Sequence, residues 1–442
     1  MEVTGQSALR NSHFVIVLCG VLILFDGYDL VVFGNVVPSL LRHPGWEFTP
    51  VVAGRIAALT LVTMAAGAVV AGTLSDRFGR RKLVLGSLAL FSAAMIVTAI
   101  SPNVEFFELS RVVAGFGLGA MFPTVTALIM EFAPARIRNL AYSFAFFGYL
   151  IGGVIAAGLG MIVIQNLGWR AMFWAGSLPL LLLPLLYKVL PESPAWLMSE
   201  GRHDTAKRVI EQYGLDPAPA ALPAHTVTSV RSRIKLMFGP GYSVATVMFC
   251  ITQFCSLLLV SGMSTWLPTI MTRLDYSLGF ALAFTLFLNI GAALGAALAA
   301  RQADKLGAKP MVVTLFALGT LSVSLITLRP PTAVAFVLIA VVGAGSLGAQ
   351  ILTNAFGASL YPAASRGAGL GFGLAVGRVG GIAGSFVGGS LLSSSVNVVW
   401  IFYLLAGIAA LGAIVALLLP LTPAAVEDRR VRRADAKRLG TC

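Results

Sequence analysis

Two carboxylates lie inside an apolar stretch near the start of the chain. Asp26 and Asp29 belong to the sequence LFDGYDLVVFG, within an apolar run from residue 14 to residue 41. Their spacing of three residues puts them on one face of a helix. A charged acid at the centre of a membrane span costs about 2.5–3.5 kcal/mol, so the pair needs a use or a partner. Repulsion between two adjacent carboxylates favours the protonated form of one, which can then take up and release a proton.

We interpret Asp26 and Asp29 as a proton-coupling pair that also helps to shape a binding site. The alternative is a structural pair, in which one acid bonds to backbone groups freed around Gly27. This alternative applies more readily to one of the two acids than to both.

A single arginine lies in a late glycine-rich stretch, GFGLAVGRVGGIAG. Arg378 follows Gly367 by eleven residues, which places it deep within an apolar span. A buried guanidinium must be paired, and its planar fork matches a carboxylate with two parallel hydrogen bonds. We therefore predict that Arg378 recognises a substrate carboxylate. The alternative is a permanent ion pair with an internal acid.

The elements that must position these residues are membrane-spanning helices. The 442 residues are 57% hydrophobic and only 11% charged, whereas soluble domains carry about 25% charged residues. A helical span needs about 20 apolar residues, and no alternating strands suggest a β-barrel. The sequence therefore predicts an all-α membrane protein with twelve transmembrane helices. The expected spans are 14–41, 51–74, 83–100, 104–130, 140–164, 171–190, 243–268, 279–300, 311–328, 332–358, 367–392 and 396–420.

The net charge of +13 is explained by membrane topology. If both termini are cytoplasmic, 24 of the 31 lysines and arginines fall in inside segments and five in outside segments. This bias follows the positive-inside rule. Basic loops scattered between spans form no single groove, so a nucleic-acid partner is not expected. The four cysteines, Cys19, Cys250, Cys255 and Cys442, have no metal or disulfide spacing and are expected to be inert.

The two halves of the chain match at an offset of 228 residues. GTLSDRFGRRK (72–82) then falls on ARQADKLGAKP (300–310), so that Asp76 aligns with Asp304. Arg138 aligns with Arg366, and glycine pairs inside the spans align at the same offset. We therefore expect two parallel repeats, each a bundle of six helices. The predicted bundles are 1–190 and 241–420, followed by a basic cytoplasmic tail, 421–442.

Between the bundles, residues 191–240 are predicted to form a cytoplasmic linker with a surface helix. PESPAWL contains a helix start, with Ser193 as the cap and Pro194 at the first helical position. DPAPAALPA (216–224) is typical of a stiff, unstructured connection. The alternative is that the linker only connects the two bundles.

These motifs resemble those of a known superfamily of carriers. GTLSDRFGRRK and ELSRVVAGFGLGAMFP (108–123) are similar to the loop and fourth-helix signatures of the major facilitator superfamily. FDGYDLVVFGNVVPSL (25–40), PESPAWL and the arginine in the eleventh span resemble the aromatic acid:proton symporters within it. The resemblance covers essentially the whole chain. It implies the major facilitator fold, and uptake of benzoate, hydroxybenzoate or gentisate into bacteria.

The resemblance also implies roles for further residues. The fourth helix lies beside the first in this superfamily, so Arg111 is expected to pair with Asp26 or Asp29 as a proton relay partner. The alternative partners of Arg111 are Glu108 and backbone carbonyls. The residues expected to form the cytoplasmic gate are Gly72, Asp76, Arg77, Gly79, Arg80, Arg81, Glu131, Arg138, Asp304 and Arg366. An aromatic substrate favours aromatic walls, and buried amides need partners. The residues expected on these grounds to contact substrate besides Arg378 are Asn35, Tyr142, Trp266, Asn289, Gln350 and Asn354. The alternative for each of them is a packing role.

One position departs from the family pattern. Some members carry a histidine in the loop between the eighth and ninth helices, where this chain has ADKLGAKP with Lys309. A role for that histidine does not carry over.

The sequence therefore predicts a secondary transporter that imports an aromatic carboxylate with a proton by alternating access. It contains no nucleotide loop, metal motif or nucleophile–base pair, so we expect no enzyme activity, no cofactor and no metal, with the proton gradient as the energy source. The expected setting is the bacterial inner membrane, with both termini cytoplasmic and a monomer sufficient for function. Open alternatives are a proton-coupled exporter of drugs or organic cations, and a symporter of a sugar or aliphatic metabolite. A sensor or a channel fits the pattern less well.

Overall fold

The computed structural model describes residues 5–134, 138–215, 237–394, 396–420 and 422–426. Within these ranges the side chains of residues 5–10, 138–140, 142–146, 304 and 363–364 are not described. The described chain contains twelve helices long and apolar enough to cross a membrane, which confirms the predicted all-α membrane protein. The spans are Asn11–Leu40, Pro50–Phe78, Arg80–Ala99, Val104–Phe132, Phe147–Leu167, Arg170–Val189, Ser243–Arg273, Leu278–Ala303, Ala308–Ile326, Thr332–Leu360, Ser365–Ser393 and Val398–Leu418.

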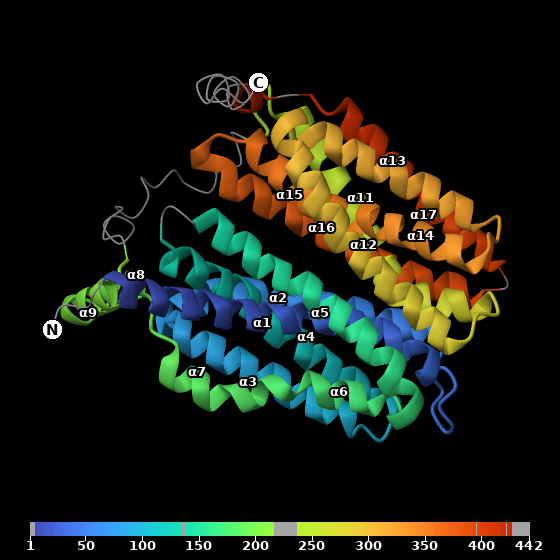
Figure 1. Ribbon diagram of the computed structural model, residues 1–442, viewed down its shortest axis with the longest axis horizontal. Helices are drawn as coiled ribbons and strands as arrows, with labels where there is room; N and C mark the ends of the chain where they lie inside the picture. Colours follow the sequence, from blue (N-terminus) through green and yellow to red (C-terminus); the bar gives the residue numbers. More distant parts are fainter. Residues whose placement is uncertain (1–4, 135–137, 216–236, 395, 421, 427–442) are drawn as a thin grey trace. The chain divides into compact units, whose positions relative to one another are not determined.

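The first six spans are built from five long helices and one broken helix (Figure 1). Prolines 179 and 184 lie at the starts of the last two pieces of the sixth span, where a missing N–H costs no helical hydrogen bond. Helix α1 packs against α5, and α4 packs against both α2 and α3. The bounds are α1 (Gly5–Leu40), α2 (Pro50–Phe78), α3 (Arg80–Ala99), α4 (Val104–Phe132), α5 (Arg138–Leu167), α6 (Arg170–Gly176), the 3₁₀ helix η2 (Leu178–Leu182) and α7 (Leu183–Val189).

The last six spans are also long helices, and the tenth of the twelve spans is irregular. That span contains a π-helical turn, η4, between two α-helical segments. Helix α13 packs against α14, α15 and α17. The bounds are α11 (Ser243–Arg273), α12 (Leu278–Leu306), α13 (Ala308–Ile326), α14 (Thr332–Gly343), η4 (Ala344–Gly348), α15 (Ala349–Leu360), α16 (Ala363–Ser393) and α17 (Val398–Leu418).

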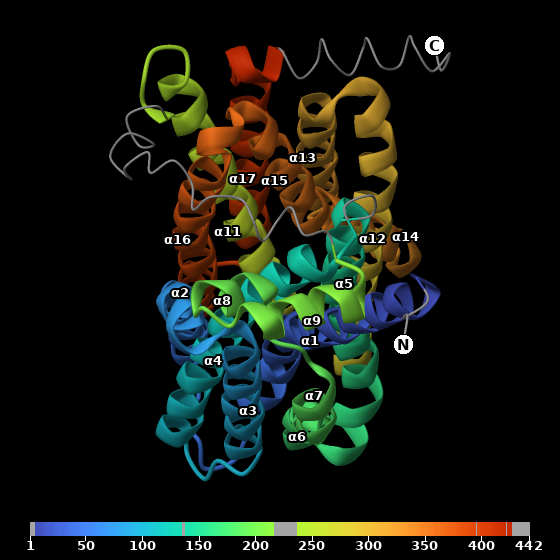
Figure 2. The same ribbon diagram turned by 90° about the vertical axis from the view of Figure 1, so that its left-hand side faces the viewer.

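Within residues 191–215, the described part of the linker contains two short helices. The Ser193 hydroxyl accepts a hydrogen bond from the Trp196 N–H, and α8 (Pro194–Ser199) begins at the proline, which confirms the predicted helix start. A turn at Gly201, with φ of 73°, separates α8 from α9 (His203–Tyr213). Figure 2 shows α9 beside the first turns of α1, and the two helices are in contact. The predicted stiff segment 216–224 lies outside the described residues.

Glycines allow the same close helix contacts in both halves. A Cβ at Gly115 would overlap the Thr60 carbonyl, and a Cβ at Gly343 would overlap the Leu288 carbonyl. Each residue of the second contact lies 228 positions after its counterpart in the first. Helix packing in membranes depends on such small residues because lipid supplies no hydrophobic force between helices.

The described chain divides into two compact units. The first holds residues up to 215 together with Ser264–Leu286, and the second holds 237 to Met263 and the residues from Phe287 onward. The segment Ser264–Leu286 contacts the first unit because Gly34 of α1 packs on the Ser264 carbonyl. The predicted second bundle, 241–420, includes this segment. Of the predicted tail 421–442, only residues 422–426 are described.

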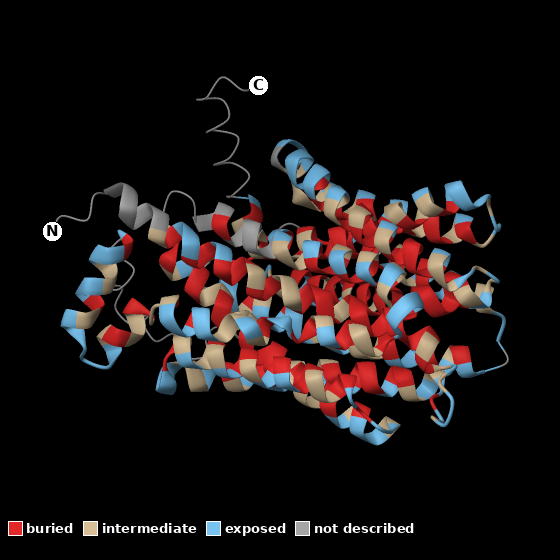
Figure 3. Ribbon diagram, turned by 60° about the horizontal axis from the view of Figure 1, so that its bottom comes forward, coloured by how far each residue is buried: buried red, intermediate tan, exposed pale blue. Residues whose placement is uncertain are grey.

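Many of the side chains exposed along the spans are apolar, as expected for helices that face lipid. Val69, Leu181, Leu298 and Leu417 are each more than half exposed. Figure 3 shows exposed residues along the outer faces of the helices and buried residues between helices. Binding and proton transfer within the spans are therefore expected at the buried polar groups.

Candidate functional site

An arginine–aspartate pair forms the charged centre of the first unit. The Arg111 Nη1 donates to Asp29 Oδ1 at 2.6 Å, and Nη2 donates to Asp29 Oδ2 at 2.8 Å. Both residues are at least 95% buried. This two-point geometry is the strongest form of carboxylate recognition by arginine. Of the partners considered from the sequence, Asp29 is the one observed, because Glu108 instead pairs with Arg55 at 2.6 Å.

The pair lies between α1 and α4, and its walls are apolar. The Arg111 guanidinium lies 5.7 Å from the ring centroids of both Phe33 and Phe173. Its Nη1 also approaches the Met95 sulfur at 3.5 Å, while the buried Nε has no hydrogen-bond partner among the described residues. An ion pair in such surroundings is poorly screened by water or salt.

Close packing of α1 against α5 holds the acidic motif in place. Gly27 lies against the Tyr149 carbonyl, and Gly152 lies against the Leu24 carbonyl, with no room for a Cβ at either position. The Tyr28 hydroxyl donates to the Met172 carbonyl at 2.8 Å. Asp26, one residue before Gly27, is also buried, with 4% exposure. The DGYD motif therefore buries both acids in the first unit.

Asn35 continues the polar face of α1. Its Nδ2 donates to the Ala156 carbonyl at 3.1 Å, whereas its Oδ1 is buried without a hydrogen-bond partner among the described residues. Trp266, also predicted to contact substrate, is 1% exposed and belongs to the first unit. The side chain of Tyr142 lies outside the described residues.

Three amides form a hydrogen-bonded cluster in the second unit. Gln253 Nε2 donates to Asn354 Oδ1 at 2.7 Å. Gln350 Nε2 donates to Gln253 Oε1 at 2.9 Å and to Asn354 Oδ1 at 3.2 Å. Gln350 and Asn354 were predicted site residues, but Gln253 of α11 was not. A glutamine inside an apolar span was the signal that could have identified it.

The two remaining predicted substrate residues also lie in the second unit. Arg378 is partly buried on α16, and Asn289 is 2% exposed on α12. A Cβ on Gly377 would lie 3.1 Å from the Gln253 carbonyl oxygen. Arg378 therefore follows the point where α16 packs on α11 beside the amide cluster.

The first loop signature, GTLSDRFGRRK, is anchored by a residue that the sequence analysis missed. Glu192 Oε1 accepts from the Arg81 backbone N–H at 3.0 Å, and its carboxylate fills the space beside Gly79, which has a φ of 88°. Trp196 Nε1 donates to the Asp76 carbonyl at 3.0 Å. Glu192 and Trp196 both belong to PESPAWL. The linker motif is therefore joined to the loop motif by two hydrogen bonds.

The other predicted gate residues are partly brought together. Arg80 forms an ion pair with Glu131, and Arg81 donates to the Tyr187 carbonyl. Gly72, Asp76 and Arg77, at the end of α2, are exposed, and within the described part of the chain no ion pair involves the Asp76 carboxylate. Arg366 is exposed, while the side chains of Arg138 and Asp304 lie outside the described residues.

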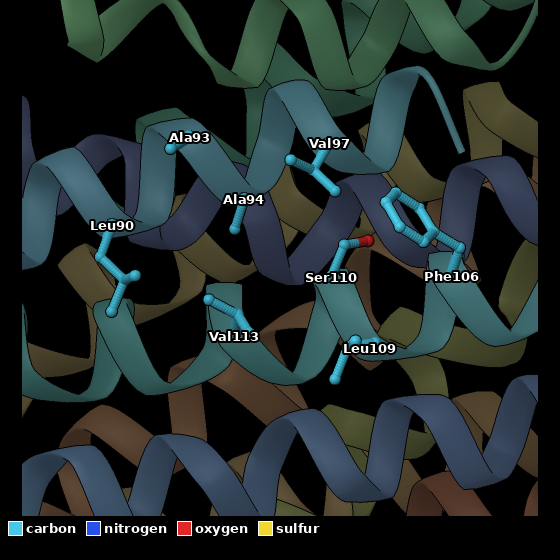
Figure 4. Close-up of a pocket in the computed structure, with 8 residues that line it drawn as sticks. All are labelled: Leu90, Ala93, Ala94, Val97, Phe106, Leu109, Ser110 and Val113. Atoms are coloured by element: carbon cyan, nitrogen blue, oxygen red, sulfur yellow. The ribbon is translucent and has the colours of Figure 1, made fainter. Parts of the chain in front are cut away.

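A groove between α3 and α4 encloses about 230 Å³ (Figure 4). Seven of its eight lining residues are apolar, and Leu109 and Phe106 are exposed. The one polar residue, Ser110, bonds to Thr98 and to the Phe107 carbonyl in its own helix. With no charged group in its wall, this groove does not suit a carboxylate.

Comparison with known proteins assigns the chain to a family. The family model of the Major Facilitator Superfamily matches residues 19–295 and 278–440. The D-xylose-proton symporter shares the fold, with a TM-score of 0.72 and 23% identity over 93% of this chain and 99% of that one. The chain belongs to the major facilitator superfamily and is a transport protein, not an enzyme.

The sequence relatives narrow this class. The benzoate transport protein of Acinetobacter baylyi is 34% identical, over 98% of this chain and 94% of the relative. The gallate transporter of Pseudomonas putida is 33% identical over 91% and 90%. The gentisate transporter of Corynebacterium glutamicum is 33% identical over 85% and 80%. Within the superfamily, the chain belongs to the aromatic acid transporters, as the DGYD motif and the loop signatures predicted.

Proposed function

We propose that this protein imports an aromatic carboxylate together with a proton, by alternating access, across the bacterial inner membrane with both termini cytoplasmic. Benzoate, hydroxybenzoates and gentisate are the candidate substrates, because the relatives carry acids of this type. The observation that carries the proposal is the buried acid pair of α1 with Arg111. A monomer contains every residue that this mechanism uses.

Substrate recognition is proposed for Arg378. A guanidinium on the glycine-rich α16 is suited to bind a carboxylate through two hydrogen bonds. Arg111 is not the proposed carboxylate receptor because both of its terminal nitrogens already donate to Asp29.

Proton binding is proposed for the acids of α1. Both Asp29 oxygens accept from Arg111, so protonating Asp29 requires the guanidinium to be released. Asp26 is therefore proposed to take the proton first. A carrier with a neutral Asp26 moves one fewer charge through the membrane interior, where charges are costly, and this difference couples the proton to transport.

The test is uptake of labelled benzoate, 4-hydroxybenzoate and gentisate into liposomes containing the purified protein. An inward proton gradient should drive accumulation of at least one of them, and Asp26→Asn should abolish the gradient's effect. If none accumulates and none competes, the proposed function is wrong. Proton-driven extrusion of an organic cation would favour the exporter instead.

A further inference from the structure

The amide cluster of the second unit leaves one strong hydrogen-bonding group unused. Gln350 Oε1 is buried and has no hydrogen-bond partner among the described residues. The residue as a whole is 7% exposed. Buried acceptors in native proteins are nearly always satisfied, so this oxygen calls for a donor that the described chain does not supply.

The orientation of the three amides leaves one oxygen of the cluster without a donor. Gln350 Nε2 faces two oxygens, Gln253 Oε1 and Asn354 Oδ1. In this orientation Gln350 directs its N–H group into the cluster and presents Oε1 as an acceptor.

The backbone positions this acceptor through an unusual element. The π-helical turn η4 ends at Gly348, two residues before Gln350. Gly345 in this turn packs on Gly319, where a Cβ would lie 2.6 Å from the Gly319 Cα. A π turn rotates the residues that follow it and is frequent at functional sites. Gln350 and Asn354, four residues apart, thereby face Gln253 of α11.

Arg378, the proposed carboxylate receptor, lies next to the position where α16 packs beside the amide cluster. Gly377, which precedes Arg378, packs against the Gln253 backbone. The Ser256 hydroxyl, three residues after Gln253 on α11, is also buried without a hydrogen-bond partner among the described residues. The unit thus combines the Arg378 guanidinium with buried hydrogen-bonding groups of neutral side chains that have no partner among the described residues.

We propose that Gln350 Oε1, held by Gln253 and Asn354, accepts a hydrogen bond from a ring hydroxyl of the substrate. This inference rests on the proposed function and specifies it: the preferred substrates are hydroxylated aromatic carboxylates, and unsubstituted benzoate binds more weakly. A site built to bond a hydroxyl discriminates strongly against an analogue that lacks one, because its own polar group is then left unpaired.

The first test uses the unmodified protein and a series of analogues that compete for uptake in proteoliposomes. 4-Hydroxybenzoate and 4-aminobenzoate carry a donor, whereas 4-methoxybenzoate, 4-fluorobenzoate and benzoate do not. The donors should compete about ten- to a hundred-fold more strongly than the others. Equal competition by all five, or a preference for the methoxy compound, would overturn the inference.

The second test uses Gln350→Met, which keeps the approximate volume and removes the acceptor. The affinity for 4-hydroxybenzoate should fall about ten- to a hundred-fold, and that for benzoate should change by less than about three-fold. The matched control is Thr353→Val, because among the described residues this buried hydroxyl bonds only to the Ala349 carbonyl of its own helix. The control should keep the ratio of the two affinities.

The outcomes separate the two proposals. Equal losses for both ligands in Gln350→Met would indicate a structural role and overturn the hydroxyl inference, while proton-driven uptake of both acids would leave the proposed function standing. If no aromatic acid accumulates or competes, the proposed function itself fails and the inference fails with it. The analogue series decides the question even if Gln350→Met does not fold.

Discussion

The two units bury different polar chemistry on the same helical frame. The first contains the Asp29–Arg111 ion pair, and the second contains the Gln253–Gln350–Asn354 amide cluster. At the offset of 228 residues, Asp29 corresponds to Leu257, Arg111 to Ile339, and Gln350 to Phe122. Asp29, Arg111 and Gln350 therefore each have an apolar counterpart in the other unit, whereas Asn354 corresponds to Thr126.

The helix contacts, in contrast, are repeated. Gly117 packs against the Ser87 carbonyl in the first unit, and Gly345 packs against the Leu315 carbonyl in the second, again 228 positions later. Only the second of these glycines lies in a π turn. Backbone contact points are thus shared by the halves, while the side chains that do chemistry are distributed between them.

This difference has an energetic consequence. Removing one partner of a buried ion pair leaves an uncompensated charge, which costs more than leaving a neutral amide unpaired. Substitutions in the first unit should therefore destabilise the protein more than matched substitutions in the second.

The largest effect is expected for Asp29→Asn. This change leaves the Arg111 guanidinium buried without a negative partner, and should lower the free energy of unfolding by about 3–5 kcal/mol. Denaturant unfolding of the detergent-solubilised protein measures the loss. The double variant Asp29→Asn, Arg111→Met removes both charges and should recover part of it. A single variant as stable as the parent would show that the pair is not a structural element.

Arg378→Lys should mainly affect binding. Lysine keeps the charge but loses the planar fork, so the affinity for an aromatic carboxylate should fall about ten- to a hundred-fold. Binding to the purified protein is the measurement, with benzamide as the neutral competitor whose affinity should stay the same. Unchanged carboxylate affinity together with reduced stability would instead indicate an internal ion pair.

The spans and several site residues could be predicted because their signals are local. Hydropathy alone gave twelve helices, and Ser193 before Pro194 gave a helix start. The pairing of Arg111 with one acid of α1 was predicted from the family resemblance, but the choice of Asp29 over Asp26 depends on how α1 and α4 pack. No local sequence pattern distinguishes Asp29 from Asp26 as the partner of Arg111.

The features that were missed depend on contacts between distant segments. Gln253 meets Gln350 across 97 residues, and the π turn that orients Gln350 has no evident signature in the sequence. Glu192 meets Arg81 across 111 residues, and its motif suggested only a helix start. The exposed Asp76 carboxylate was the more conspicuous acid in the loop signature, yet Glu192 is the one bonded to that loop.

A smaller effect is expected for Gln253→Leu in the second unit. This change removes an acceptor from Gln350 and a donor from Asn354, and should cost about 1–3 kcal/mol in the free energy of unfolding. Ser256→Ala on the same face of α11 is the matched control and should change stability by less than about 0.5 kcal/mol, because its hydroxyl has no bond to lose. If Gln253→Leu destabilises as much as Asp29→Asn, the energetic contrast between the units does not hold.

The smallest effects are expected at the two equivalent loops. Gly79 and Gly307 have φ values of 88° and 92°, so the backbone turn is repeated. In the first loop a carboxylate, Glu192, accepts from the backbone, whereas in the second Lys309 donates to the Leu419 carbonyl at 2.8 Å. Each loop is therefore held by a hydrogen bond to a charged side chain, and the two side chains have opposite charge.

Glu192→Gln keeps an acceptor oxygen but removes the charge, and because the site is partly exposed the loss should be about 1 kcal/mol. Glu192 also joins the linker to the predicted gate, so the maximal rate of uptake should change while the KM stays within about two-fold. Lys309→Met should cost no more stability and should test whether the second loop acts in the same way. A shift in KM in Glu192→Gln with an unchanged maximal rate would place this carboxylate in substrate binding, and would remove the reason for assigning the loop to a gate.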